Sequence, residues 1–126
     1  MAGPGVEIEE LPDGGRVFEV AGPDISWIRV DHQTRLQFGD AELVIECPFS
    51  LRSGDTVIQL DPNDREGLGP LLALYPDSLA HLTMAPDGTL NAAFSSGAVL
   101  TVPPDPHFEA WSIGGFWCPP GGMSKA

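Results

Sequence analysis

SWIRVDHQTRLQF, at residues 26–38, shows within one short stretch how this chain folds. Apolar and polar residues alternate through Ser26–Asp31 and again through Thr34–Phe38, and His32 and Gln33 separate the two runs. Alternation with a period of two is typical of half-buried strands, and a short polar link joins such strands into a hairpin. The stretch therefore predicts an antiparallel pair of strands.

Runs of the same kind recur on both sides of this pair, with glycine, proline, serine and aspartate between them. They are Arg16–Val20, Glu42–Cys47, Thr56–Leu60, Leu79–Ala85, Thr89–Phe94, Val99–Val102 and Phe108–Ile113. The pattern breaks once, at Asp61–Pro76, where Leu68, Leu71, Leu72 and Tyr75 fall at helical spacing. We therefore expect a mainly β (α+β) fold. It consists of two antiparallel β-meanders, at 26–60 and 79–113, which form a small barrel or sandwich, with one short helix at about 69–75 between them.

Length and composition bound the organisation of the chain. The 126 residues are enough for a single domain with a modest core. Residues 1–15 contain glycine and proline among acidic residues, which predicts a loose N-terminal lead-in, and residues 16–126 form the β-rich domain.

The two predicted meanders resemble each other in the spacing of their apolar residues, which indicates an internal repeat. Each set has a pair of apolar residues, a third six positions later, and three more beyond. The first set is Ile28, Val30, Leu36, Phe38, Leu43 and Ile45, and the second is Leu82, Met84, Leu90, Phe94, Leu100 and Val102.

The formal charge of −12, with only six Lys and Arg residues, argues against partners that are polyanions. Binding to nucleic acid through phosphates, or to an anionic membrane surface, needs a basic stripe that this chain lacks. The acidity could steer a basic protein partner, or it could serve only solubility. Since no leader or membrane span is recognisable in the sequence, we expect a cytoplasmic location.

No motif for catalysis, metal binding or a cofactor is recognisable. The chain has no G-x-S-x-G elbow, no glycine-rich phosphate loop and no C-x-x-C pair. We therefore expect no catalytic residues, no metal and no cofactor, and hence a protein that is not an enzyme. Cys47 and Cys118 are expected to be free thiols, although a disulfide between them stays open.

Two outward surfaces are informative. In the hairpin at 26–38, alternation places Trp27, Arg29 and Arg35 on the face opposite the core, and a tryptophan–arginine group is typical of binding hot spots. A row of cross-strand ion pairs is the simpler reading of that face. In the second meander the outward set is small and nearly uncharged, which suits burial against the other sheet or against a second copy in a homodimer: His81, Thr83, Ala85, Asn91, Ala93, Ser95, Val99 and Thr101.

The C-terminal region concentrates aromatic residues among glycines and prolines. Trp111, Phe116 and Trp117 lie here, and the last two are held between Gly114-Gly115 and Pro119-Pro120. Such rings form an exposed aromatic lip for a partner or ligand, or they close the end of a small β core.

The segment from Leu79 to Trp111 carries the residues of a known pattern. It contains DGTL at 87–90, FSSGAVLTVPPDP at 94–106 and FEAW at 108–111. This resembles a family of small actinobacterial proteins of unknown function with the signature DGTL…F…G…L.VPPDP.YEAW. The members of that family are broadly similar to small β-rich immunity proteins. Phe108 stands where the signature has tyrosine, and a further strand of that pattern would be shortened here, at residues 123–126. The resemblance implies a bacterial β-rich domain and no established activity.

These observations lead to one function and one alternative. The first is a non-enzymatic protein-interaction domain, immunity-like or regulatory, with binding residues Trp27, Arg29, Arg35, Trp111, Phe116 and Trp117. The alternative is a small-molecule-binding module with a pocket between the meanders near the C-terminal aromatic segment, lined by Trp111, Phe116 and Trp117.

Overall fold

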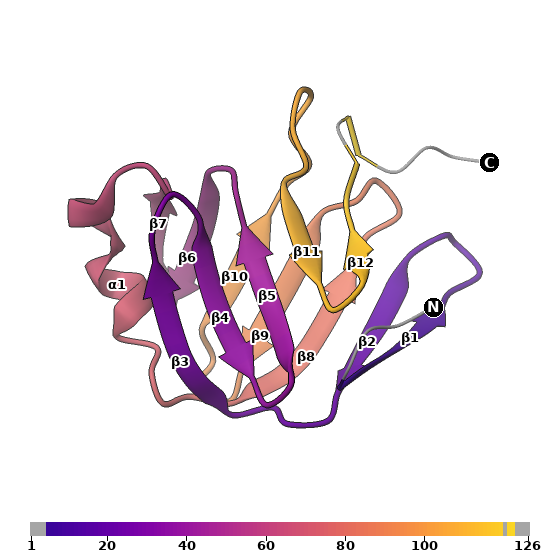
Figure 1. Cartoon of the computed structure of the whole chain (residues 1–126), viewed down its shortest axis with the longest axis horizontal. Coiled ribbons are helices and arrows are strands. Elements are labelled where there is room, and N and C mark those ends of the chain that lie inside the picture. The colour runs from indigo at the N-terminus through magenta and orange to yellow at the C-terminus, as the bar shows by residue number, and fades with distance from the viewer. Residues whose placement is uncertain (1–4, 120, 123–126) are drawn as a thin grey trace.

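Two antiparallel sheets pack face to face in the computed structural model, which describes residues 5–119 and 121–122 (Figure 1). The seven-stranded sheet has the order β1 (Val6–Glu10), β2 (Arg16–Val20), β8 (Leu79–Met84), β9 (Leu90–Phe94), β10 (Val99–Val102), β6 (Phe49–Ser53) and β7 (Thr56–Leu60). The five-stranded sheet has the order β12 (Phe116–Trp117), β11 (Trp111–Ile113), β5 (Ala41–Ile45), β4 (Thr34–Phe38) and β3 (Ile25–Val30). The prediction of two antiparallel assemblies with one short helix is confirmed, and the arrangement is a sandwich rather than a closed barrel.

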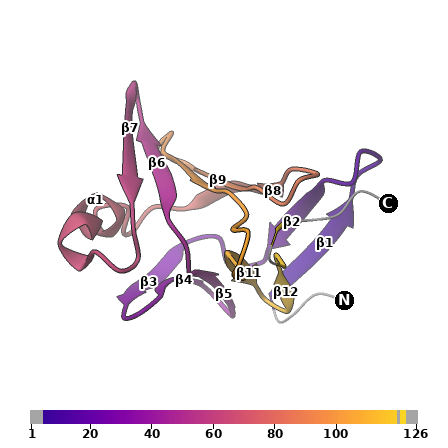
Figure 2. The ribbon, with the colours of Figure 1, turned by 90° about the horizontal axis from the view of Figure 1, so that it is seen from above.

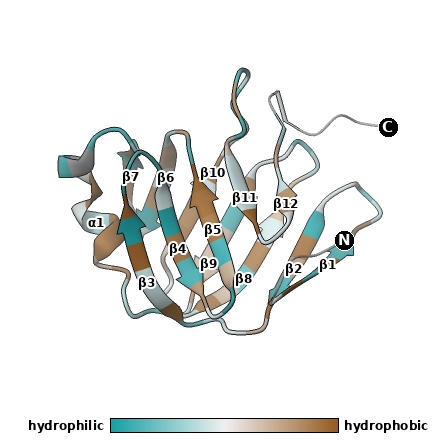
Figure 3. Ribbon diagram, in the orientation of Figure 1, coloured by the Kyte–Doolittle hydropathy of each residue, from teal (hydrophilic) through white to brown (hydrophobic). Residues whose placement is uncertain are grey.

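The core lies between the sheets, because the inward residues of the strands are apolar and the outward ones are mostly polar. Buried and half-exposed residues alternate without exception along β4, β5 and β9. Leu36, Leu43 and Leu90 are fully enclosed. Figure 3 shows this alternation as successive apolar and polar bands along the strands.

The helical segment lies at one end of the sandwich, between the edges of the two sheets (Figure 2). It consists of a 3₁₀ turn, η1 (Arg65–Leu68), and a short helix, α1 (Gly69–Leu72). The helix begins where the sequence predicts but ends at Leu72 instead of residue 75. The reason is Pro76, which lacks an N–H and disfavours helical backbone at the residue before it.

The N-terminal lead-in is the first correction, because it contains a strand. β1 pairs with β2 over five positions, from Val6 with Val20 to Glu10 with Arg16. Val6 is buried and Glu7 and Glu9 are exposed. The alternation in Val-Glu-Ile-Glu was thus a strand signal that the neighbouring glycines and prolines masked.

The boundaries of the meanders are the second correction. The first ends at Ile45 and the second at Val102, because at these points the chain crosses to the opposite sheet. After Pro48 it forms β6, which the sequence analysis missed, and the β6–β7 hairpin pairs with β10. After the prolines at 103–106 it forms β11, which pairs with β5. Prolines cannot donate to a ladder, so the strands stop there and the chain is free to change sheets.

Strand pairing confirms the internal repeat and corrects its alignment. In the first meander Ile25 pairs with Phe38 and Ile28 with Leu36, and in the second Leu79 pairs with Phe94 and Leu82 with Ala92. Each hairpin has one irregularity, at the second residue of its first strand. The register therefore matches Leu36 with Ala92, not with Leu90 as the apolar spacing predicts.

The two halves meet in a small backbone bridge at equivalent positions, where Asp24 pairs with Ser78. The N–H of Ile25 donates to the carbonyl of Asp77 over 3.0 Å, and the N–H of Leu79 donates to the carbonyl of Pro23 over 2.8 Å. The Ser78 hydroxyl also donates to the Asp24 carboxylate. Since Ile25 and Leu79 begin equivalent strands, the bridge lies on an approximate two-fold axis that relates the sheets.

Three aromatic rings fill the end of the sandwich opposite α1. Trp111 is fully buried, and its ring stacks on Phe116 at 5.7 Å and meets the edge of Phe18 at 6.0 Å between centroids. The indole N–H of Trp111 donates to the carbonyl of Gly88 over 2.9 Å. This hydrogen bond ties β11 in one sheet to the β8–β9 turn of the other.

We predict that Trp111→Phe lowers the free energy of unfolding by about 3 kcal/mol. The substitution leaves a cavity and removes the partner of a buried carbonyl. Urea unfolding followed by circular dichroism measures the loss. Trp117→Phe is the matched control, because the same substitution at a half-exposed ring is expected to cost no more than about 0.5 kcal/mol. Equal losses in the two variants would contradict this account.

Candidate functional site

The outer side of the five-stranded sheet is the candidate site, and we call it the tryptophan face. Pairing aligns its outward residues in two rows across the sheet. They are Arg29, Arg35, Val44, Ser112 and Trp117 in the first row, and Trp27, Gln37 and Glu42 in the second. No described segment of the chain lies over this face, which is toward the viewer in Figure 1.

The two exposed tryptophans mark opposite edges of the tryptophan face. Trp27, on β3, is 38% exposed, and Trp117, on β12, is 51% exposed. Four strand spacings separate these edges, which is a distance of about 19 Å. The face is thus a platform with one large ring at each edge.

The middle of the platform is polar and internally paired. Arg35 donates to Glu42 over 3.0 Å and to the side-chain oxygen of Gln33 over 2.5 Å. Gln33 in turn donates to Glu46 over 2.9 Å. Of the predicted row of cross-strand ion pairs, the pair Arg35–Glu42 is present, and only a quarter of the Arg35 side chain is exposed. Arg35 orients its neighbours more than it offers a charge to a partner.

Arg29 differs from Arg35 in its exposure. Its side chain is 63% exposed, and its only ion pair in the described part of the chain is a long one, with 3.9 Å between Nε and an Asp31 oxygen. An exposed pair of this length contributes little to stability. The guanidinium of Arg29 is therefore available to a partner.

The C-terminal aromatic residues do not form one site. Trp111 is enclosed in the core and cannot contact a partner. Phe116 points inward, where Phe18 lies 5.4 Å away and the Arg16 guanidinium lies 4.8 Å above its ring. Trp117 points to the opposite side, onto the tryptophan face. The three rings therefore do not line a common pocket, and two of them close the end of the sandwich.

A family model matches residues 17–123, from β2 to a point past β12. Its description is Family of unknown function (DUF6188). The chain belongs to this family. No curated protein matches the chain, and no solved structure matches it. The match spans both meanders and both crossing hairpins, so the tryptophan face lies within the DUF6188 region.

The cysteines of this DUF6188 chain are free, buried thiols. Burial raises the pKa of Cys47 to about 11, and the Asp105 carboxylate beside it adds to the shift. Burial likewise raises the pKa of Cys118. Both thiols are protonated at neutral pH, and a protonated thiol is a poor nucleophile.

Within 5–119 and 121–122, no group of His, Cys, Asp and Glu side chains could hold a metal ion. No helix in the same ranges is long and apolar enough to cross a membrane.

The outer face of the second meander is open in the DUF6188 fold, so the expected burial against the other sheet is wrong. Asn91, Ala93, Val99 and Thr101 lie on the far side from the core and are partly exposed. No described segment lies over that side of the sheet in Figure 2. The homodimer alternative for this face stays a prediction.

Sequence reasoning named Trp117 but missed that it shares a face with Trp27, and it missed Ser112 and the neighbouring Asp31. Ser112 and Trp117 join Trp27 and Arg29 only because β11 pairs with β5, and no local pattern reports that long-range pairing. Asp31, at the end of the β3–β4 hairpin, was also missed. Its carboxylate accepts the Gln33 N–H over 2.8 Å and faces Arg35 at 3.8 Å.

We predict that Asp31 contributes to stability above about pH 4 and that this contribution disappears in acid. The Gln33 N–H and the Arg35 charge hold the pKa of Asp31 below its ordinary value. A carboxyl whose pKa is depressed by folding stabilises the fold above its unfolded pKa, and the effect is lost as the pH falls through the folded pKa. The free energy of unfolding of Asp31→Asn, measured in urea, should therefore fall less than that of the parent between about pH 6 and pH 3. Asp40→Asn, at the exposed β4–β5 turn, is the control, and an Asp31→Asn curve parallel to the parent's would contradict the prediction.

Proposed function

We propose that the protein is a non-enzymatic interaction domain that binds a protein partner through the tryptophan face. The observation that carries the proposal is the placement of two exposed tryptophans and one loosely paired arginine on a single uncovered sheet face. Tryptophan and arginine are enriched among the few residues that carry most of the binding energy of protein interfaces.

The dimensions of the face fit such a role. Rings about 19 Å apart span a patch typical of standard interfaces, which bury about 800 Å² on each partner. The residues between the rings are held by ladder hydrogen bonds and by the Arg35 network, so little ordering entropy is lost on binding. Trp27, Arg29 and Trp117 supply the contacts in this proposal. Arg35 positions its neighbours, and Trp111 and Phe116 support β11 and β12 from within.

The partner is basic in this proposal, because the net charge of −12 speeds the encounter with a positively charged protein. The resemblance to an actinobacterial signature and to immunity proteins supports an immunity-like or regulatory role in the cytoplasm. We do not propose a small-molecule pocket at the C-terminal aromatic segment, because Trp111 and Trp117 point to different sides of β11 and β12 and do not face a common space.

We predict that the tagged protein captures a specific partner from an actinobacterial lysate and that Trp27→Ala/Trp117→Ala reduces the captured amount at least about tenfold. Loss of two hot-spot rings is expected to cost more than about 2 kcal/mol of binding free energy. Quantitative mass spectrometry of the eluates measures the reduction.

The matched control removes two large exposed apolar side chains from elsewhere on the surface, in Leu72→Ala/Phe108→Ala. All three proteins must first give the same circular dichroism spectrum and urea midpoint. Equal capture by the two double variants, or no enrichment by the intact protein, would refute the tryptophan face as the binding site.

A further inference from the structure

The four outer edges of the two sheets differ in how they are protected against pairing with another strand. β1 carries Glu7, Glu9 and Glu10, β3 has an irregularity and the exposed Arg29, and β12 is only two residues long. Charges, bulges and shortness are the usual means by which proteins prevent a strand from adding to an edge.

The fourth edge, β7, has none of these protections. Its five residues, Thr-Val-Ile-Gln-Leu, include no charge and no proline, and they pair regularly with β6. Val57 is 57% exposed and Ile58 is 36% exposed. Among the described residues, no backbone hydrogen bond beyond those to β6 engages this strand. An uncharged, regular and apolar edge is a template for a further strand.

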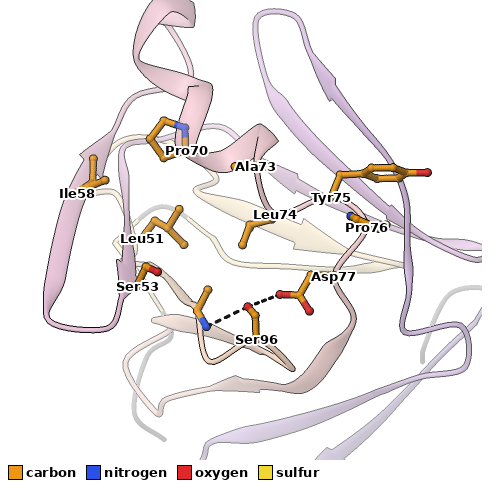
Figure 4. Close-up of a pocket in the computed structure, with 11 residues that line it drawn as sticks. Leu51, Ser53, Ile58, Pro70, Ala73, Leu74, Tyr75, Pro76, Asp77 and Ser96 are labelled. Carbon is orange, nitrogen blue, oxygen red and sulfur yellow. Dashed lines mark hydrogen bonds between the residues drawn. The ribbon is translucent and has the colours of Figure 1, made fainter.

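An apolar groove of about 460 Å³ adjoins β7 on its inner side (Figure 4). Its apolar wall consists of Leu51, Ile58, Pro70, Ala73, Leu74 and Tyr75. Asp77 and Ser96 lie at one side of the groove, where the serine hydroxyl donates to the carboxylate. The groove can accept an apolar side chain next to a cationic group.

The approximate two-fold axis relates the β6–β7 hairpin, beside the groove, to the β11–β12 hairpin at the opposite end of the sandwich. Ile58 pairs with Leu51 as Phe116 pairs with Ile113, so Ile58 and Phe116 occupy equivalent positions. Phe116 is covered by Phe18, which comes from the additional strand β2. Ile58 has no such cover in the described part of the chain and opens onto the groove.

From these observations we propose that β7 binds an extended segment of a partner protein as an additional antiparallel or parallel strand. Backbone hydrogen bonds to the free edge hold the segment, and alternate side chains of the segment enter the groove beside Ile58. This is recognition by strand addition, in which the ladder gives affinity and the pocket gives specificity.

Acidic residues around β7 define the chemistry of the segment. Asp55 precedes the strand and Asp61 follows it, and Asp77 lies at the groove. A segment that alternates apolar with lysine or arginine residues complements this arrangement. Its apolar side chains face the groove, and its basic ones meet Asp55 and Asp61 at the two ends of β7, outside the position where Arg52 pairs with Val57.

The same charges disfavour a second copy of this chain on the edge. An antiparallel β7–β7 pair with full overlap is centred on Ile58, and this register sets Asp55 directly against Asp61 of the other copy, at both ends. Like charges in directly opposite positions destabilise a strand pair. The occupant is therefore a basic segment of a different protein. This site is separate from the tryptophan face and does not depend on it.

The test measures binding of an acetylated and amidated peptide of alternating lysine and valine by nuclear magnetic resonance of the ¹⁵N-labelled protein. We expect saturable binding, with the largest amide shifts at Val57, Gln59 and the groove residues. The dissociation constant should rise with added salt. A peptide with the same sequence and N-methyl groups on alternate backbone nitrogens should bind at least about tenfold more weakly, because it cannot complete the ladder.

A protein variant tests the edge from the other side. Since the two-residue turn at Gly54-Asp55 pairs Ser53 with Thr56, hydrogen bonding alternates so that Gln59 directs its N–H away from β6. Gln59→Pro removes this donor, and edge strands tolerate proline at such a position. The variant should bind the peptide at least about tenfold more weakly. Trp27→Ala should leave the affinity unchanged, which separates this site from the tryptophan face.

The proposal is overturned by absence of saturable binding up to about 1 mM peptide, a concentration that detects even interactions of about −4 kcal/mol. It is also overturned by equal affinity for the N-methylated peptide or by amide shifts centred elsewhere. A dimer in sedimentation that dissociates in Gln59→Pro would assign the edge to a second copy and overturn the basic segment as its occupant.

Discussion

The backbone bridge between Asp24 and Ser78 is the constraint on which the rest of the architecture depends. It joins the first strand of one meander to the first strand of the other, one residue before each strand begins. The irregularities in β3 and β8 follow within two residues of the bridge, and an irregularity of this kind bends a strand. The two sheets therefore diverge from a shared line, and the core fills the space between them.

Exchange of hairpins completes each sheet from the opposite half of the chain. β6–β7 follows the first meander but extends the second, and β11–β12 follows the second meander but extends the first. Trp111 reinforces the exchange through its hydrogen bond to Gly88. Neither half can bury its apolar face alone, because each lacks two strands that only the other supplies. The fold is therefore cooperative across its full length, and its contacts are predominantly long-range.

Local patterns in the sequence identified most strands and the pairing within each meander, but not the pairing between distant strands. Alternation identified β3, β4, β9 and β10 and placed Trp27, Arg29 and Arg35 on an outward face. It missed β6, because Cys47-Pro48 reads as an ending and the short Phe-Ser-Leu run lies between two loops. The burial of Trp111 and the exposure of Trp117 depend on which strand β11 joins, and pairing across many residues leaves no signal in a short window. The helix was placed correctly at its start, where Pro70 fits the first turn, and not at its end.

The approximate two-fold symmetry gives the molecule two outer faces that share a five-strand layout, to which β1 and β2 are added on one side. One bears the exposed tryptophans and Arg29, and the β8–β10 part of the other bears threonine, asparagine and alanine. Inward positions are bound to a common core, so the outward ones can change independently on each side. Whatever occupies one face of such a protein therefore does not obstruct access to the other.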